Sequence, residues 1–288
     1  MKLGAFWAKA IVSETDRDGK RCELSCWRSS ESSQADAHEN AVLAAKRALR
    51  RLLAGDPPDR YAYGETPLRE ETIDRISDSF GRIVGVVTRN RYGALVLNTE
   101  RAMFFDLDFP PVALRESVSF FFRRLIKPSA RSPDSHRELE TVRRLHEVLS
   151  DMPDWSLRLY RTHSGLRALV MHDVFDPLSD DTKALMESFG CDPLYVRLCK
   201  SQGCFRARLT PKPWRCGHPA CPVRWPTEDA NEDDRFRQWL AGYRARCSRY
   251  ATCRFLGVLG SAIAHPEVAA IVELHDRATQ CDEQLPLA

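Results

Sequence analysis

The chain lacks any apolar run long enough to cross a membrane, because no stretch approaches the roughly 18 to 20 residues that a spanning helix needs. Its first residues also lack the continuous apolar segment found at the centre of a signal peptide. We therefore expect a cytoplasmic protein with no membrane partner. Internal repeats and low-complexity tracts are missing too, which argues against repeat architectures and long disordered regions.

The net charge is small, but it is distributed unevenly. The formal charge of the 288 residues is only +3. Residues 197–254, however, contain thirteen Lys and Arg against five Asp and Glu. A basic segment of this kind favours a phosphate-rich partner such as a nucleotide or a nucleic acid, with solvated surface charge as the alternative.

Ten cysteines are present, and seven of them fall within residues 191–253. In the cytoplasm they are not expected to pair as disulfides. Four residues separate Cys199 from Cys204, and four separate Cys216 from Cys221. Two such pairs could close a tetrahedral zinc site, and the alternative is a set of buried thiols without metal.

The pattern of apolar residues and turn residues predicts three units in an α+β chain. We expect residues 1–80 to form a small β-hairpin and helix unit, residues 81–232 to form the core, and residues 233–288 to form a helical C-terminal extension. For the core we expect a mixed or antiparallel central sheet with covering helices. At 43% hydrophobic residues, the chain can bury one large core or two modest ones.

Local patterns predict the individual elements. Strands are predicted at residues 5–12, 21–28, 83–87, 94–97, 102–109, 155–160, 166–173, 194–198 and 205–209. Helices are predicted at residues 36–53, from Thr66 onward, and at 118–126, 135–150, 179–189 and 266–280.

Two carboxylates alternate within the strand predicted at residues 102–109. Side chains of a strand point to opposite faces with a period of two, so Asp106 and Asp108 share one face. Like charges at that distance repel unless a cation lies between them, and hard oxygen ligands suit Mg²⁺ or Mn²⁺. The alternative is that the pair marks the end of the strand and faces water.

Three segments of the chain carry a resemblance to a known family. In order they are the Asp106 and Asp108 strand, the strand-turn-strand Tyr160 to Arg167, and Cys191 to Arg197 leading into Phe205 to Lys212. This order resembles the catalytic core of the archaeo-eukaryotic primase superfamily, the primase-polymerases, over residues 94–215. The family's first motif is an hhhDhD strand, its second a small-residue turn entering a strand with a basic residue, and its third an hD followed by an Arg-containing strand. The resemblance implies a primase-polymerase core with an RRM-like sheet.

The resemblance also implies roles for individual residues. Asp106, Asp108 and Asp192 would be the catalytic carboxylates and would hold two Mg²⁺ or Mn²⁺ ions. An Asp before a proline also commonly opens a turn, which is the structural alternative for Asp192. The family allows, but does not demand, a zinc element where the cysteine pairs lie.

In the second motif, Ser164, Gly165 and Arg167 would face the triphosphate. The usual family residue at the position of Arg167 is histidine, and an arginine cannot release its proton. The only nearby histidine is His163, which precedes the glycine and is otherwise explained as an exposed loop residue. This departure puts catalytic competence in question.

Basic residues follow in the third motif. Arg206 and Arg208 alternate within a predicted strand and therefore share a face, which suits a phosphate chain. Lys212 and Arg215 extend this basic group. Between them lies Trp214, which could stack on a base or fill the core.

These observations favour a metal-dependent nucleotidyltransferase that uses nucleoside triphosphates to extend or prime a nucleic-acid strand, in DNA replication or repair. One alternative is a metal-dependent nuclease, because paired acids with two metals also serve hydrolysis. Another is a catalytically inactive nucleic-acid-binding domain of the same fold. The sequence contains no helicase motif, so any unwinding partner would be a separate chain.

Overall fold

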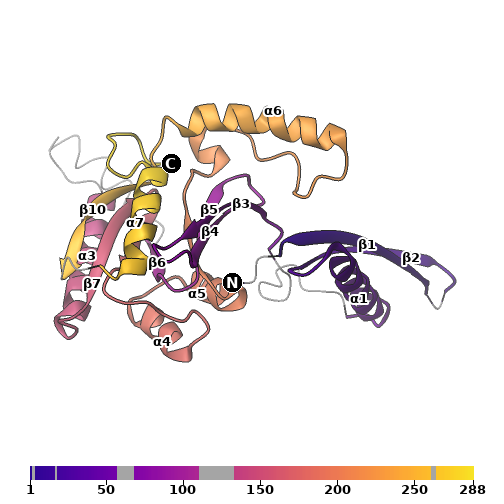
Figure 1. Ribbon diagram of the computed structural model, residues 1–288, viewed down its shortest axis with the longest axis horizontal. Coiled ribbons are helices and arrows are strands. Elements are labelled where there is room, and N and C mark those ends of the chain that lie inside the picture. The colour runs from indigo at the N-terminus through magenta and orange to yellow at the C-terminus, as the bar shows by residue number, and fades with distance from the viewer. Residues whose placement is uncertain (2–3, 17, 57–67, 110–132, 261–263) are drawn as a thin grey trace.

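The computed structural model describes residues 1, 4–16, 18–56, 68–109, 133–260 and 264–288. Within these ranges the strands form three antiparallel sheets, accompanied by six α-helices. Figure 1 shows how these elements are arranged. The α+β class is therefore confirmed. The helix predicted at residues 118–126 lies outside the described residues. In the described ranges, no helix combines the length and the apolar character needed to span a membrane.

The N-terminal hairpin and helix form as predicted. Strand β1 (Phe6–Thr15) pairs with β2 (Arg21–Ser30), and helix α1 (Gln34–Leu53) packs against both strands. Ser33 caps α1 by accepting a hydrogen bond from the backbone of Asp36. The buried face of the helix consists of Ala37, Ala41, Ala45 and Leu49, a row with a spacing of four residues. These elements lie at one end of the molecule in Figure 1.

The first four-stranded sheet has the order β3-β4-β5-β9. Its strands are β3 (Glu71–Ser77), β4 (Ile83–Arg89), β5 (Leu95–Thr99) and β9 (Phe205–Arg208). The helix predicted from Thr66 onward is wrong for the residues from Glu71, which form strand β3 instead. The charged residues of this segment favoured a helix, but pairing with β4 along its length decides its conformation.

The second four-stranded sheet has the order β10-β7-β8-β6. Its strands are β6 (Phe104–Asp108), β7 (Ser156–Thr162), β8 (Gly165–Val170) and β10 (Cys253–Gly260). Strand β10 lies in the extension that was predicted to be mostly helical, and it pairs with β7. C-terminal residues therefore complete the sheet that carries the aspartate strand.

The remaining helices connect and cover the strands. They are α3 (Pro133–Ser150), α4 (Asp180–Ser188), α5 (Pro193–Gln202), the 3₁₀ helix η1 (Pro213–Cys216), α6 (Ala230–Cys247) and α7 (Pro266–Thr279). Helix α5 replaces the strand predicted at residues 194–198. Its ends explain the difference, because Asp192 caps the N-terminus, Pro193 takes the first helical position, and Gly203 ends the helix at a φ of 62°.

One main core joins the two four-stranded sheets. Leu97 and Phe205 from the first sheet pack in the same buried cluster as Phe104 and Leu169 from the second. Phe105 stacks on Phe189, which follows α4, with ring centroids 5.1 Å apart. The sheets are therefore parts of one folded body rather than separate domains.

Helix α7 contributes a buried polar group to this core. His275 is fully buried, and its Nδ1 lies 3.1 Å from Asp276 Oδ1. Its Nε2 has no hydrogen-bond partner among the residues that the structure describes. The Tyr160 hydroxyl of β7 donates to the same Asp276 oxygen at 2.6 Å, and Arg158 pairs with the other one. Burial lowers the pKa of His275 to about 4; the hydrogen bond and charge of Asp276 oppose this shift, and the Arg167 charge adds to it.

We expect His275 to make stability depend on pH. Its pKa lies below the 6.5 of an unperturbed histidine, so the unfolded chain binds the extra proton and stability falls as the pH drops from 6.5 towards 4. Between pH 7 and pH 4.5 this single group should cost about 2 to 3 kcal/mol. Urea unfolding at both pH values should show a smaller loss for His275→Leu than for the wild type. His136→Leu, which removes an exposed histidine of α3, is the matched control. Equal losses for the wild type and His275→Leu would contradict the assignment.

Candidate functional site

The candidate site lies where the edge strands of the two sheets meet. Strand β6 is an edge strand of the second sheet, β9 is an edge strand of the first sheet, and the two strands are in contact. Tyr195 of α5 joins them, since its hydroxyl accepts a hydrogen bond from the backbone of Arg206 at 3.1 Å and lies 3.0 Å from the carbonyl oxygen of Phe104. Burial raises the pKa of Tyr195, so the hydroxyl stays protonated and can donate to that carbonyl.

All three predicted aspartates meet at this junction. Asp106 and Asp108 follow one another on the same face of β6. Asp192, far along the chain, donates its backbone N–H to the carbonyl oxygen of Asp106 at 3.2 Å. Burial, followed by the charges of Asp106 and Asp192, raises the pKa of Asp108. The Asp192 carboxylate is therefore close enough to act electrostatically on Asp108.

The aspartates do not form a ready-made ligand sphere. In the part of the chain that the structure describes, no group of three or more His, Cys, Asp or Glu is arranged to hold a metal ion. The donor chemistry nevertheless fits a hard divalent cation, because the groups are carboxylates and because burial, together with their mutual repulsion, already raises the pKa of Asp108. Asp192 also uses one oxygen to cap α5, so it has a structural role at the start of this helix as well.

Arg167 is engaged by Asp106 and does not project freely from the site. It lies directly opposite Asp106 in the register of β6 and β8. Its Nε and Nη2 donate to the two carboxylate oxygens at 2.9 and 3.3 Å, and its Nη1 donates to the carbonyl oxygen of Arg208 at 2.9 Å. Burial by itself would lower the pKa of Arg167, but the Asp106 charge outweighs it and raises that pKa. Arg167 thus fixes Asp106 and links three strands instead of facing a triphosphate.

Gly165 and Ser164 have structural partners at the turn between β7 and β8. A Cβ at Gly165 would lie 2.1 Å from the carbonyl oxygen of Leu107, so glycine is needed for the close approach of β8 to β6. Ser164 Oγ accepts a hydrogen bond from Arg215 Nη2 at 2.8 Å, which ties the turn to η1. His163 is exposed, with its Nδ1 3.2 Å from the same Oγ.

Arg206 is held away from the aspartates. Its Nη2 donates to both carboxylate oxygens of Glu70 at 2.7 and 2.9 Å, and both side chains are buried. Within the described part of the chain, its Nη1 has no hydrogen-bond partner. Glu70 also accepts from the Thr88 hydroxyl. Arg206 therefore joins β9 to the segment before β3, and we do not assign it to phosphate binding. The sequence gives no signal that pairs it with Glu70.

Arg208, Lys212 and Arg215 form a cationic group beside the aspartates. Burial, followed by the charge of Arg167, lowers the pKa of Arg208 to about 10. Burial and then the charges of Arg208 and Arg215 lower the pKa of Lys212, which the Asp108 charge opposes. Three cations thus repel one another close to Asp108. A bound anion such as a phosphate would relieve that repulsion.

The four cysteines predicted as zinc ligands are divided between different environments. Cys199 belongs to the main core, and Cys216 belongs to a second cluster with Trp239 and Tyr243. Cys221 donates its thiol to the carbonyl oxygen of Val223. Burial raises the pKa of Cys199 to about 12, which disfavours the thiolate that zinc requires. Cys204 is buried beside Asn98. Zinc binding gains no support from these residues, and it remains a prediction only.

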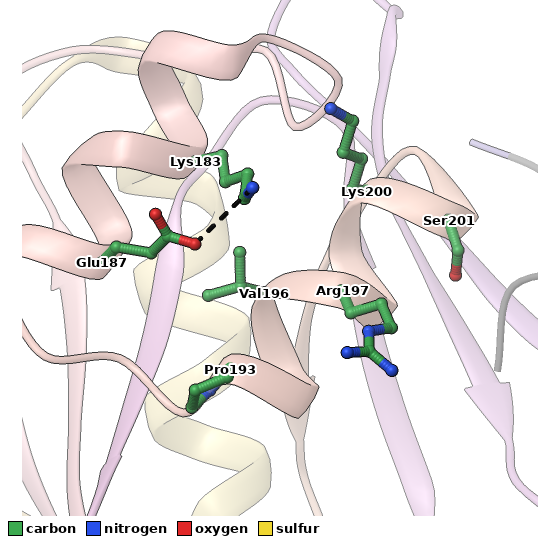
Figure 2. A pocket seen from close by; sticks show the side chains of 7 residues that line it. All are labelled: Lys183, Glu187, Pro193, Val196, Arg197, Lys200 and Ser201. Carbon is green, nitrogen blue, oxygen red and sulfur yellow. Dashed lines mark ion pairs between the residues drawn. The ribbon is translucent and has the colours of Figure 1, made fainter. Parts of the chain in front are cut away.

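A pocket between α4 and α5 lies next to the site but differs from it chemically. Figure 2 shows Lys183, Arg197 and Lys200 around it, with Val196 at its centre. Lys183 pairs with Glu187 at 3.7 Å, and Lys200 pairs with Asp180 at 2.6 Å. The two lysines are therefore drawn to different carboxylates, and the pocket does not present a convergent anion site.

Comparisons with known proteins add no assignment. No protein-family model matches the chain, and no curated protein or solved structure matches it. Function is therefore inferred from the site itself.

Proposed function

We propose that the protein is a metal-dependent nucleotidyltransferase of primase-polymerase type, which uses nucleoside triphosphates on a nucleic-acid strand. The observation that carries this proposal is the meeting of Asp192 with the Asp106 and Asp108 strand, next to the cationic group of Arg208, Lys212 and Arg215. Carboxylates for a divalent cation and cations for phosphates are the two components that phosphoryl transfer needs.

In this proposal the acidic and the basic residues of the site have different roles. Asp106, Asp108 and Asp192 would hold Mg²⁺ or Mn²⁺, and such an ion, when bound, supplies charge to the attacking and leaving oxygens. Arg208, Lys212 and Arg215 bind and orient the phosphates. Arg167 holds the Asp106 carboxylate in one orientation through two hydrogen bonds. Because an arginine does not release its proton, Arg167 contributes position and charge and no proton transfer.

A second candidate function is a nucleic-acid-binding domain without catalytic activity. The observation in its favour is the Arg167 and Asp106 pair, because the arginine already neutralises one of the three carboxylates. In this case the cationic group would bind a strand through its phosphates, and affinity would fall steeply with added salt.

Incorporation of a labelled nucleotide in the presence of Mn²⁺, on a primed and an unprimed template, tests the proposal. Extension of the primer, or synthesis on the unprimed template, is the expected result. Shortening of the strand would replace the proposal with a nuclease. Salt-sensitive strand binding with neither reaction would favour the inactive binding domain.

A further inference from the structure

Trp214 is the feature that the proposed chemistry leaves unused. It lies on η1, between Lys212 and Arg215 of the cationic group, and its side chain remains 50% exposed. The sequence left two roles open for Trp214, stacking on a base or filling the core. Its exposure disfavours the second role, because a tryptophan that filled the core would be buried. A large exposed aromatic residue beside a charged site has a flat surface available for a ligand.

The segment that carries Trp214 is firmly held. The Tyr243 hydroxyl of α6 donates to the carbonyl oxygen of Pro211, and Cys216 is buried in the second cluster. On the other side, Arg215 donates to Ser164 in the turn between β7 and β8. The indole is therefore presented by a backbone attached at both ends, which reduces the ordering cost of binding.

Trp214 contacts one aromatic ring, Tyr92, and one cation, Lys212, and a second cation lies over the Tyr92 ring. Tyr92, in the turn between β4 and β5, packs against it with ring centroids 5.1 Å apart and ring planes at 87°. Because the rings are nearly perpendicular, Tyr92 supports the indole without stacking on it. Lys212 Nζ lies 5.6 Å from the Trp214 ring, and the Arg91 guanidinium lies 4.6 Å from the Tyr92 ring. Alternation of aromatic rings and cations is typical of surfaces that bind bases and phosphates together.

Lys212 connects this aromatic surface to the aspartates. It lies close enough to the Trp214 ring for a cation–π contact, and it interacts electrostatically with Asp108, Arg208 and Arg215. A phosphate bound by Lys212 and Arg215 would therefore be near both the carboxylates and the indole. A ligand that joins a phosphate chain to a flat aromatic group matches this arrangement.

We propose that Trp214 stacks on the nucleobase of the substrate nucleoside triphosphate, whose phosphates are bound by Lys212 and Arg215. This inference rests on the proposed function, and it adds the subsite for the base. The indole would contact the flat face of the base, and all four bases have such a face. Trp214 should therefore contribute similarly to the binding of all four nucleotides.

Equilibrium binding of each nucleoside triphosphate, of inorganic tripolyphosphate and of a single-stranded oligonucleotide tests the proposal. Trp214→Leu should weaken nucleoside triphosphate binding about five- to a hundredfold and leave tripolyphosphate binding unchanged. Trp214→Phe should lose less affinity for nucleoside triphosphates than Trp214→Leu, because an aromatic ring remains to stack on the base. Phe80→Leu is the matched control, since Phe80 is a 90% exposed aromatic residue outside the site. It should bind every ligand as the wild type does.

The other outcomes overturn the inference in distinguishable ways. If Trp214→Leu binds nucleoside triphosphates as tightly as the wild type, Trp214 does not contact the base. An equal loss for tripolyphosphate would show that Trp214 only supports the cationic group. A loss confined to the oligonucleotide would assign the stacked base to the strand. Wild-type protein that binds neither nucleoside triphosphate nor tripolyphosphate would overturn the proposed function itself, and this inference with it.

Discussion

Replacement of Asp108 by asparagine should abolish nucleotidyl transfer while leaving the protein folded. A cation held by carboxylates contributes several kcal/mol to phosphoryl transfer, so loss of one carboxylate should lower the rate about a thousandfold. Stability should not fall, because burial and the charges of Asp106 and Asp192 already disfavour the ionised form of Asp108. Removal of its charge relieves that repulsion. Labelled nucleotide incorporation measures the first effect, and urea unfolding at pH 7 measures the second.

The comparison needs a control that changes an aspartate to asparagine elsewhere. Asp234→Asn fits, because this residue lies on the exposed surface of α6 and pairs only with Arg237 among the described residues. It should retain full activity. Asp106→Asn is a poorer test of chemistry, since it also removes the partner of the buried Arg167. Full activity of the Asp108→Asn variant would refute the assignment of the aspartates.

The second large effect concerns the Arg167 and Asp106 pair. Arg167→Met should lower the free energy of unfolding by about 3 kcal/mol, the lower end of the cost of breaking a buried ion pair, because Arg167 is buried but Asp106 is only partly buried. Arg167 is only 2% exposed, and it also donates to the carbonyl oxygen of Arg208 on the neighbouring sheet. Its loss therefore leaves Asp106 without its counterion and removes a link between β8 and β9. Denaturant unfolding of the wild type and the variant measures the difference.

A double-mutant cycle with Asp106→Asn separates the pair from its surroundings. The two changes should cost less together than separately, with a coupling energy of about 2 kcal/mol. The matched control is Arg143→Met, which breaks the exposed pair with Glu147 on α3 and should cost less than about 1 kcal/mol. A similarly small loss for Arg167→Met would mean that the pair of Arg167 and Asp106 does not stabilise the fold.

Elements with a clear local pattern were predicted from the sequence. The alternation of Phe105, Leu107 and the two aspartates identified strand β6 and the face that the aspartates share. The hairpin of β1 and β2 followed from apolar runs on either side of a turn that contains Gly19, which has a φ of 81° in the structure. In these segments the local preference and the tertiary environment agree, so a short window of sequence suffices.

Other elements depend on partners that a local pattern does not contain. Strand β10 is stabilised by β7, nearly a hundred residues earlier in the chain, and α7 follows it closely enough that the whole tail resembles a helical segment. The segment at residues 194–198 contains apolar residues compatible with a strand or a helix. Its capping residues, Asp192 and Gly203, decide in favour of the helix.

The site was predictable only in part, for the same reason. The shared face of Asp106 and Asp108 follows from strand geometry, whereas the arrival of Asp192 beside them depends on the path of the whole chain. Arg206 and Arg208 alternate on β9 as predicted, yet only Arg208 acts on the aspartates, because Glu70 binds Arg206. Alternation defines a face of a strand, but it does not define what lies opposite that face.

The late position of β10 and α7 in the chain has a consequence for biosynthesis. While the ribosome is still translating the segment before residue 253, β7 has no neighbour on its outer edge and the core lacks Val268 and Ile271. The nascent polypeptide therefore exposes apolar surface and an open strand edge until the C-terminal elements emerge. A chain that stops before residue 253 should therefore keep this apolar surface and strand edge exposed, and it should aggregate where the chain with β10 and α7 folds.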